Sequence, residues 1–165
     1  MTHCVACLDL RRRRCLVIGS GAIAEEKVAG LRACGAIVET AAAYEPELLE
    51  GVWLVVVAGG GDGERVYRDA DERRIFCNVA DVPELCSFIL PAIHRRGPIA
   101  LAVSTGGASP ALAQRLRDDF ASQLADEHER LAEELRSLRP WARENLATYA
   151  ERRDFFRDRV AEALA

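Results

Sequence analysis

The sequence has no apolar run long enough to cross a membrane. A membrane-spanning helix needs about 20 consecutive apolar residues, and no stretch of this 165-residue chain approaches that length. The N-terminus is polar and is soon followed by four arginines at residues 11–14, which argues against a secretory signal peptide. We therefore expect a cytoplasmic protein that does not associate with a membrane.

Positive charge is also in short supply. The formal net charge at pH 7 is −4, because 26 aspartates and glutamates outnumber 22 lysines and arginines. A general nucleic-acid binder carries the opposite excess, so no nucleic-acid partner is expected. The sequence contains no P-loop, no HExxH motif and no signature of a Ser/His/Asp triad, which argues against the enzyme classes that these motifs mark.

The sequence lacks a set of cysteines and histidines with the spacing of a metal site. His3, Cys4 and Cys7 are grouped near the N-terminus, but a zinc site normally needs four ligands and no second pair has matching spacing. Cys15 and Cys77 lie inside apolar runs, where a thiol behaves as a small apolar group. We therefore predict no metal site and thiols that stay reduced.

The stretch from Cys15 to Lys27 joins a short apolar run to a pair of glycines and then to a helical pattern. Residues 15–18 predict a buried strand, and Gly19 and Gly21 follow directly. This order is the first half of a dinucleotide-binding βαβ unit. Gly19 allows the tight turn, and Gly21 lets a pyrophosphate approach the backbone at the N-terminus of the helix. The alternative is an ordinary βα turn that binds nothing.

Apolar runs and helical patterns then alternate along the chain. The first helix ends at residues 34–35, further strands are predicted at 37–40, 53–58 and 75–79, and a second helix is predicted at 64–74. This alternation predicts parallel strands joined by right-handed crossovers. A short leading strand is also predicted over residues 4–10.

The second half of the chain follows a different pattern. Apolar runs at 88–93 and 99–104 predict a hairpin or a pair of extended strands. Ser109 and Pro110 predict the N-cap and first residue of a helix. Helical patterns continue to the C-terminus, with an interruption predicted at Pro140.

The predicted fold class is therefore α/β, a Rossmann-like parallel sheet with a C-terminal helical dimerisation region. We place an NAD-binding domain at residues 1–110 and a helical region for dimerisation and for covering the substrate at residues 111–165. A helix pair joined to a Rossmann unit usually needs a partner surface, so a homodimer is expected.

Polar residues follow two of the apolar runs. Asp81 comes just after a buried strand, where a carboxylate can be partly desolvated with a raised pKa, as suits a general acid or base. The alternative is that Asp81 caps the turn from Pro83 to Cys86. The loop at residues 104–109 offers hydroxyls and backbone N–H groups to an anion. Arginines 95, 96, 115 and 117 could bind carboxylates of a substrate, or could form a solvated face.

Four stretches together resemble the precorrin-2 dehydrogenase/sirohydrochlorin ferrochelatase family, the N-terminal module of siroheme synthase. They are residues 15–27, 74–83, 87–93 and 102–113. The resemblance implies NAD-dependent oxidation of precorrin-2, a tetrapyrrole, to sirohydrochlorin. Many members also insert ferrous iron as a further substrate to give siroheme, and members of this kind form dimers.

The resemblance assigns roles to individual residues. The catalytic aspartate of the family falls on Asp81. The contacts to NAD fall on the glycine turn and on the end of the second strand, at Gly19, Ser20, Gly21, Ala22, Ile23, Ala43 and Tyr44. We assign the tetrapyrrole substrate to Asn78, Ser104, Thr105, Gly106, Gly107 and Arg115.

The chain departs from the family in two places. The span between Tyr44 and Trp53 lacks a strand that family members usually have, and Gly59–Gly61 stands where they tend to have a Thr-Asp-Asp type of sequence. Two alternatives stay open. One is a sirohydrochlorin chelatase, or another tetrapyrrole-processing enzyme, without dehydrogenase activity. The other is a non-catalytic protein that binds a tetrapyrrole or a nucleotide.

Overall fold

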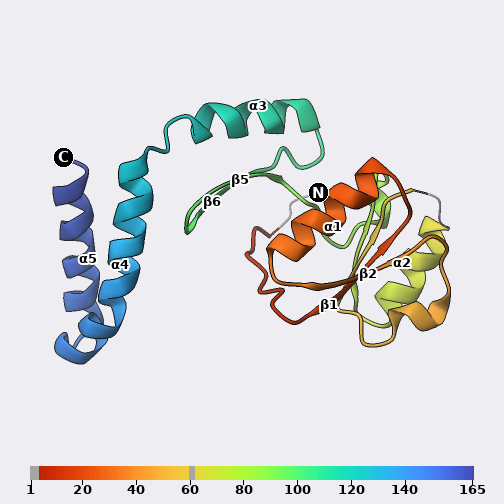
Figure 1. Ribbon diagram of the computed structural model, residues 1–165, viewed down its shortest axis with the longest axis horizontal. Helices are drawn as coiled ribbons and strands as arrows, with labels where there is room; N and C mark the ends of the chain where they lie inside the picture. Colours follow the sequence, from red (N-terminus) through yellow and green to blue (C-terminus); the bar gives the residue numbers. More distant parts are fainter. Residues whose placement is uncertain (1–3, 60–61) are drawn as a thin grey trace. The chain divides into compact units, whose positions relative to one another are not determined.

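The computed structural model describes residues 4–59 and 62–165. The chain forms two compact units, the first ending at Leu90 and the second beginning at Pro91 (Figure 1). The functional boundary proposed after residue 110 stays a prediction.

The first unit is built on a parallel sheet of four strands. The strands are β1 (Arg14–Ile18), β2 (Ile37–Ala41), β3 (Leu54–Val57) and β4 (Phe76–Val79), in the order β2-β1-β3-β4. The helices are α1 (Ala22–Ala33) and α2 (Gly63–Glu72), with short 3-10 turns at Pro46–Leu49 (η1) and Pro83–Leu85 (η2). The predicted Rossmann-like sheet is therefore confirmed.

Both faces of this sheet are buried. Side chains alternate between the two faces along a strand, so Leu16 and Ile18 join the apolar cluster that includes α2. Cys15 and Val17 join the other cluster, which includes α1. β3, and β1 from Cys15 on, are covered on both sides and so form continuous apolar runs in the sequence, whereas the edge strand β2 has no buried residue.

The predicted leading strand is wrong. Residues 4–10 form no strand, and their apolar side chains find little cover, since Val5 is 87% exposed while Leu10 is buried. Asp9 instead pairs with Arg11 at 2.6 Å, which starts the turn into β1. An apolar run forms a strand only where a neighbouring strand accepts its hydrogen bonds, and the sequence does not reveal that neighbour.

The second unit begins with an antiparallel hairpin of β5 (Ala92–Arg96) and β6 (Ile99–Val103), which confirms the predicted pair. It continues with α3 (Pro110–Ala121), α4 (Asp126–Asn145) and α5 (Tyr149–Ala163). The Ser109 hydroxyl accepts a hydrogen bond from the Leu112 N–H, as predicted for an N-cap. Arg96 bonds the Leu124 carbonyl and Asp126, and so ties the hairpin to the start of α4.

The predicted interruption at Pro140 is also wrong. Pro140 lies inside α4, which continues to Asn145. The chain turns instead before α5, where the Thr148 hydroxyl accepts from the Glu151 N–H and the Glu151 carboxylate accepts from the Thr148 N–H. This capping box sets the start of α5. No helix in the described part of the chain is long and apolar enough to span a membrane.

Candidate functional site

Gly19 is the point where β1 leaves the sheet. Its φ is +124°, and its N–H donates to the Ala41 carbonyl at 2.9 Å. A Cβ at this position would lie 2.6 Å from the carbonyl oxygens of Ala58 and Gly59. The end of β3 therefore comes so close that only glycine fits, which explains the first glycine of the turn.

Gly21, in contrast to Gly19, has open space where a side chain would be. It is the N-cap of α1 with a φ of +83°, and a Cβ built there meets no described atom within 4 Å. The first helical bond runs from the Glu25 N–H to the Gly21 carbonyl at 3.0 Å. The N–H groups of Ala22 and Ile23 therefore have no partner within the helix, and Ser20 beside them is exposed. Open space in front of unpaired N–H groups fits a pyrophosphate.

The end of β2 presents backbone rather than side chains. Ala43 is exposed, whereas Tyr44 is buried and donates its hydroxyl proton to Asp69 at 2.7 Å. Burial, with a further contribution from this bond, raises the pKa of Tyr44 to about 12. The guanidinium of Arg65 covers the ring at 5.3 Å. Only the backbone of Tyr44 can therefore face a cofactor.

Asp81 lies in the turn that follows β4. Its φ of +63° places it in the left-handed region, where side chains other than glycine are uncommon. Its side chain is exposed in this unit, so the expected desolvation is not found there. Within the described residues its carboxylate has no hydrogen bond or ion pair. The N-cap of η2 is Val82, so the alternative that Asp81 caps that turn is wrong.

Cys86 closes the turn that carries Asp81. Its Sγ lies 3.3 Å from the carbonyl oxygens of both Val79 and Val82, which are on either side of Asp81. The amide of Asn78 donates to the Phe88 carbonyl at 3.0 Å and lies 3.4 Å from the same sulfur. Cys86 was not among the residues predicted for the site; a thiol shortly after a candidate catalytic residue was the available signal in the sequence.

Asn78 itself is half-buried, and its side-chain NH₂ group already donates to groups within the protein. A contact to substrate would therefore come from its amide oxygen.

The glycine turn and Asp81 lie at the same edge of the sheet. The bonds from the Ala58 N–H to the Ile18 carbonyl, 2.7 Å, and from the Ala80 N–H to the Val57 carbonyl, 2.9 Å, carry the pairing to that edge. Asp81 is two strands away from the glycine turn, about 10 Å across the sheet. β2 and β3 lie on opposite sides of β1 in the sheet, so the strand order reverses its direction at β1. Ligands of open α/β sheets bind beside such a switch point. Gly60 and Gly61 lie outside the described residues.

The loop before α3 belongs to the second unit. The Thr105 hydroxyl accepts from the Ser109 N–H and lies 3.1 Å from the Ser109 carbonyl. The Ser104 hydroxyl accepts from the Gly106 N–H at 3.1 Å. Gly106 and Gly107 have φ values of +64° and +88°. The Gly107 N–H has no acceptor among the described residues, so it is the group of this loop most available to an anion.

Three of the four arginines that were candidates for carboxylate binding, Arg96, Arg115 and Arg117, have carboxylate partners of their own. Arg115 is exposed and pairs with Asp119 at 3.0 Å, and Arg117 pairs with Asp118 at 2.7 Å. Arg96 ties the hairpin to α4, as described above. Asp119 is bonded to the Nε of Arg115, and no hydrogen bond to the two terminal nitrogens of this exposed guanidinium is found among the described residues, so they can still donate to a ligand.

No group of three or more histidine, cysteine, aspartate or glutamate side chains that could hold a metal ion occurs among residues 4–59 and 62–165. Cys4 and Cys7 are exposed, whereas Cys15 and Cys77 are buried as predicted.

Comparison with known proteins gives two family matches. Residues 6–92 match a family described as "Putative NAD(P)-binding", and residues 96–123 match one described as "Sirohaem biosynthesis protein central". These matches cover the sheet and the loop described above.

Siroheme synthases of Citrobacter koseri and Salmonella typhi are each 36% identical to this chain over 193 aligned positions, which include all of the chain. The chain spans 42% of the length of these relatives. The alignment is longer than the 165 residues, so the relatives contain segments that this chain lacks.

A solved structure, titled "SirC, precorrin-2 dehydrogenase", has the same fold. The TM-score is 0.73 at 23% identity, with 94% of this chain and 88% of that chain covered. Over half of the chain matches the NAD(P)-binding family. The chain therefore belongs to that family, and its resemblance to the dehydrogenase module of siroheme synthase is confirmed.

Proposed function

We propose that this chain catalyses the NAD-dependent oxidation of precorrin-2 to sirohydrochlorin. The observation that supports it best is Asp81, an exposed carboxylate without a described partner, in a left-handed turn at the same sheet edge as the glycine turn. Unfavourable backbone conformations often mark functional sites. The family description supports a nicotinamide cofactor, and the names of the relatives support this reaction.

The first unit would hold the cofactor mainly through backbone groups. The N–H groups at the start of α1, from Ala22 and Ile23, would bind the pyrophosphate, with Ser20 beside them. The backbone of Ala43 and Tyr44 would bind the ribose. When bound, NAD supplies the acceptor for a hydride.

The protein residues would deal with the proton and the substrate. Oxidation of precorrin-2 removes one hydride and one proton, and Asp81 would take the proton as a general base. The eight carboxylates of the substrate require donors, for which we propose Arg115, the Gly107 N–H and the Ser104 hydroxyl. Gly106 and Thr105 would contribute by shaping the loop, through their bonds to Ser104 and Ser109. Asn78 would contribute its amide oxygen.

The shortened segment after Tyr44 is held by bonds to α2. The Tyr44 hydroxyl reaches Asp69, and Arg73 donates to the Pro46 carbonyl at 2.6 Å. These bonds fix the backbone beside the ribose site without the strand that family members usually have. They support retention of the cofactor and hence of the dehydrogenase reaction.

Further proposals concern iron and assembly. Ferrous iron would be a second substrate, with Asp81 as one carboxylate ligand while the macrocycle supplies nitrogens. Leu112 and Phe120 on α3 are each 49% exposed, which supports a homodimer through this helix. We expect the protein in the cytoplasm.

The decisive experiment is an assay of the purified protein with precorrin-2, with and without NAD, followed by ferrous iron. Asp81→Asn should lower kcat by about 10²- to 10⁴-fold and leave the Kd of NAD unchanged. Glu84→Gln, which removes an exposed carboxylate from η2, serves as the matched control and should leave kcat unchanged.

The outcomes separate the alternatives. Iron insertion without NAD binding would replace the dehydrogenase by a chelatase. Binding of NAD or tetrapyrrole without either reaction would indicate a non-catalytic binding protein. Undiminished oxidation by Asp81→Asn would remove the proposed role of that residue.

A further inference from the structure

The α4–α5 pair of the second unit contains a cavity that the proposed reaction does not use. It has a volume of about 340 Å³, and four arginines line it together with Tyr149, Phe156 and Ala142. We call it the α4–α5 cavity. Its volume is at the lower end of the range of small-molecule pockets, about 300–1,000 Å³.

The walls of the α4–α5 cavity are held in place. Arg152 donates to the Leu146 carbonyl at 2.6 Å and to the Ala147 carbonyl at 3.2 Å, across the link between the two helices. The capping box of Thr148 and Glu151 fixes the first turn of α5 beside it. A ligand would therefore find the site already formed.

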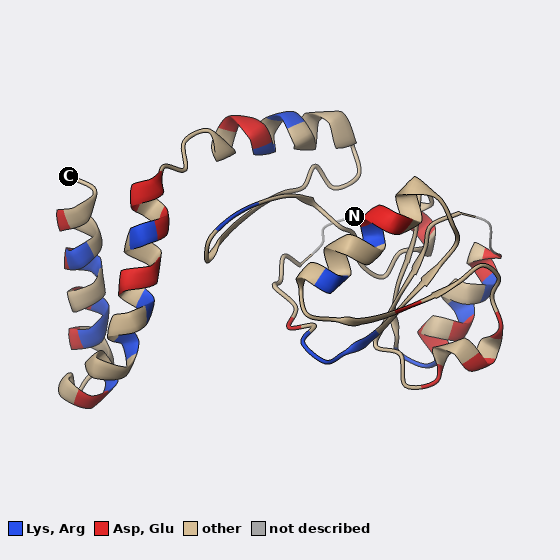
Figure 2. Ribbon diagram, viewed as in Figure 1, with Lys and Arg blue, Asp and Glu red and all other residues tan. Residues whose placement is uncertain are grey.

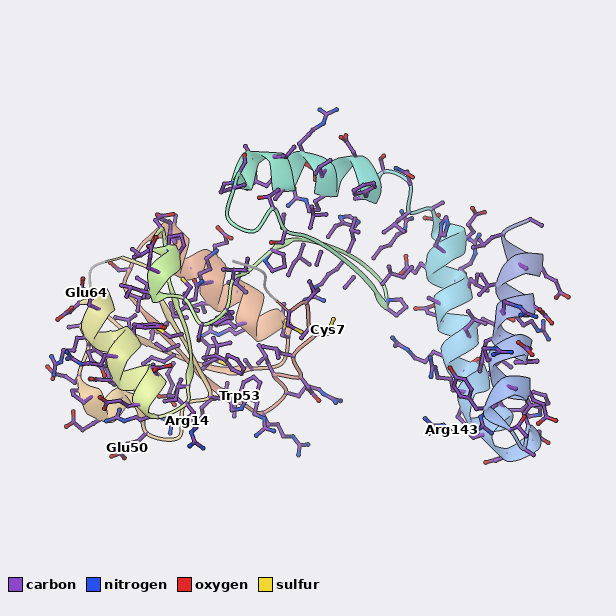
Figure 3. The ribbon with its side chains drawn as sticks, turned by 180° about the vertical axis from the view of Figure 1, so that it is seen from behind. Cys7, Arg14, Glu50, Trp53, Glu64 and Arg143 are labelled. Atoms are coloured by element: carbon purple, nitrogen blue, oxygen red, sulfur yellow. The ribbon has the colours of Figure 1, made fainter. Side chains whose placement is uncertain are left out.

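The charge of the cavity is opposite to that of the chain. Arginines 139, 143, 152 and 153 line it, and no carboxylate does, whereas the whole chain carries −4. Arg153 pairs with Asp154 at 2.8 Å. Arg143, near the end of α4 (Figure 3), has no hydrogen bond or ion pair among the described residues and is exposed. Basic residues cluster toward this end of α4 (Figure 2).

The remaining wall is apolar and aromatic. Arg139 lies over the Phe156 ring at 5.8 Å, and Tyr149 is exposed. A flat conjugated body can pack against such rings and arginine planes. A guanidinium binds a carboxylate through paired hydrogen bonds.

We propose that the α4–α5 cavity binds carboxylates carried on a flat conjugated body. Two sources have this chemistry: small aromatic polycarboxylates, and a tetrapyrrole polycarboxylate such as the substrate proposed above. This binding does not depend on the proposed reaction, because every residue that lines the cavity belongs to α4 or α5, whereas Asp81 and the glycine turn belong to the first unit.

Calorimetric titration of the 165-residue chain tests this proposal with three probes. Benzene-1,3,5-tricarboxylate represents the small aromatic source, uroporphyrin the tetrapyrrole source, and citrate the carboxylates without a conjugated body. At least one of the first two should bind, and citrate should bind at least tenfold more weakly. The double variant Arg139→Gln/Arg143→Gln should weaken binding at least tenfold.

The matched control is Arg130→Gln/Arg136→Gln. It makes the same change of charge on α4 at exposed positions that do not line the cavity. The control should bind the probe within twofold of the wild type, and all variants should keep the helical circular dichroism and the Kd of NAD.

Three results would overturn the proposal. They are no binding of either conjugated probe, equal weakening in the control, and binding of citrate as tight as that of the conjugated probe. Binding of uroporphyrin alone, weakened by the double variant, would assign the cavity to tetrapyrroles, and binding of both conjugated probes, weakened in the same way, would assign it to conjugated polycarboxylates in general. Neither result depends on whether precorrin-2 is oxidised.

Discussion

Gly19 and Gly21 stand two residues apart but are required for different reasons. At Gly19 the backbone of β3 leaves no room for a side chain, whereas at Gly21 the space is open. The close packing at Gly19 makes the first glycine a requirement of folding, whereas the role that we propose for the second is in binding the cofactor.

Alanine at each position should separate these roles. Gly19→Ala should lower the free energy of unfolding by about 2–4 kcal/mol, because its Cβ meets two carbonyl oxygens at a positive φ. Gly21→Ala should cost about 1–3 kcal/mol, from its backbone conformation alone, and should weaken NAD binding at least tenfold. Urea denaturation and calorimetric titration measure the two effects. Equal loss of stability in both variants would contradict this assignment.

Cys86 should act on the reaction through the position of Asp81. Cys86→Ala removes the sulfur that bridges the Val79 and Val82 carbonyls, and kcat should fall about three- to tenfold with little change in the Kd of NAD. Cys86→Ser keeps a donor and should restore most of the rate. If serine and alanine have the same kcat, the hydrogen bond has no positioning role.

The Tyr44 hydroxyl should make stability depend on alkaline pH. The folded protein holds its pKa at about 12, above the ordinary value of 10.0. This stabilisation is complete below pH 10 and is lost as the pH rises toward 12. Tyr44→Phe should remove that part of the slope when unfolding by urea is measured from pH 9 to 11.5. An unchanged slope would show that Tyr44 does not titrate in this way.

For single residues, the sequence predicted which residues belong to the candidate site better than it predicted their exposure, backbone conformation and neighbours. The glycine turn and Asp81 could be predicted because their residue types follow strands directly. The exposure and left-handed backbone of Asp81, and the bridging sulfur of Cys86, depend on how the chain returns from η2, which no local pattern encodes.

Among the elements, the strands were the easiest to predict. A strand covered on both faces must be apolar throughout, so β3, and β1 from Cys15 on, are visible as continuous runs, whereas Asn78 interrupts the run of β4. The helix boundary after α4 was harder. Pro140 suggested an interruption, but the helix continues through it, because the capping box of Thr148 and Glu151 sets the turn.

Pro140 should therefore weaken α4. A proline inside a helix removes one backbone hydrogen bond and crowds the preceding turn. Pro140→Ala should raise the free energy of unfolding by about 1–3 kcal/mol, as measured by thermal and urea unfolding. Ser137→Ala, one turn earlier on α4, is the control and should change stability by less. Destabilisation by Pro140→Ala would show that α4 is interrupted at this residue.

For the molecule as a whole, the division into two compact units predicts that the first unit folds without the second. Every buried member of both apolar clusters of the first unit lies between Leu10 and Val79. A fragment of residues 1–90 should unfold cooperatively in urea and should bind NAD with the Kd of the full chain. A fragment of residues 1–110, which ends at the boundary predicted from the sequence, is the comparison. If only the longer fragment folds, the hairpin is needed by the first unit.

The left-handed turn at Asp81 also bears on how this site can evolve. Asparagine and glycine tolerate that backbone conformation, whereas β-branched residues do not. A single change to asparagine would therefore erase the acid and preserve the shape of the surrounding chain. Homologues that no longer catalyse the oxidation but still bind the cofactor or the tetrapyrrole should therefore have asparagine at this position and keep their glycine turn.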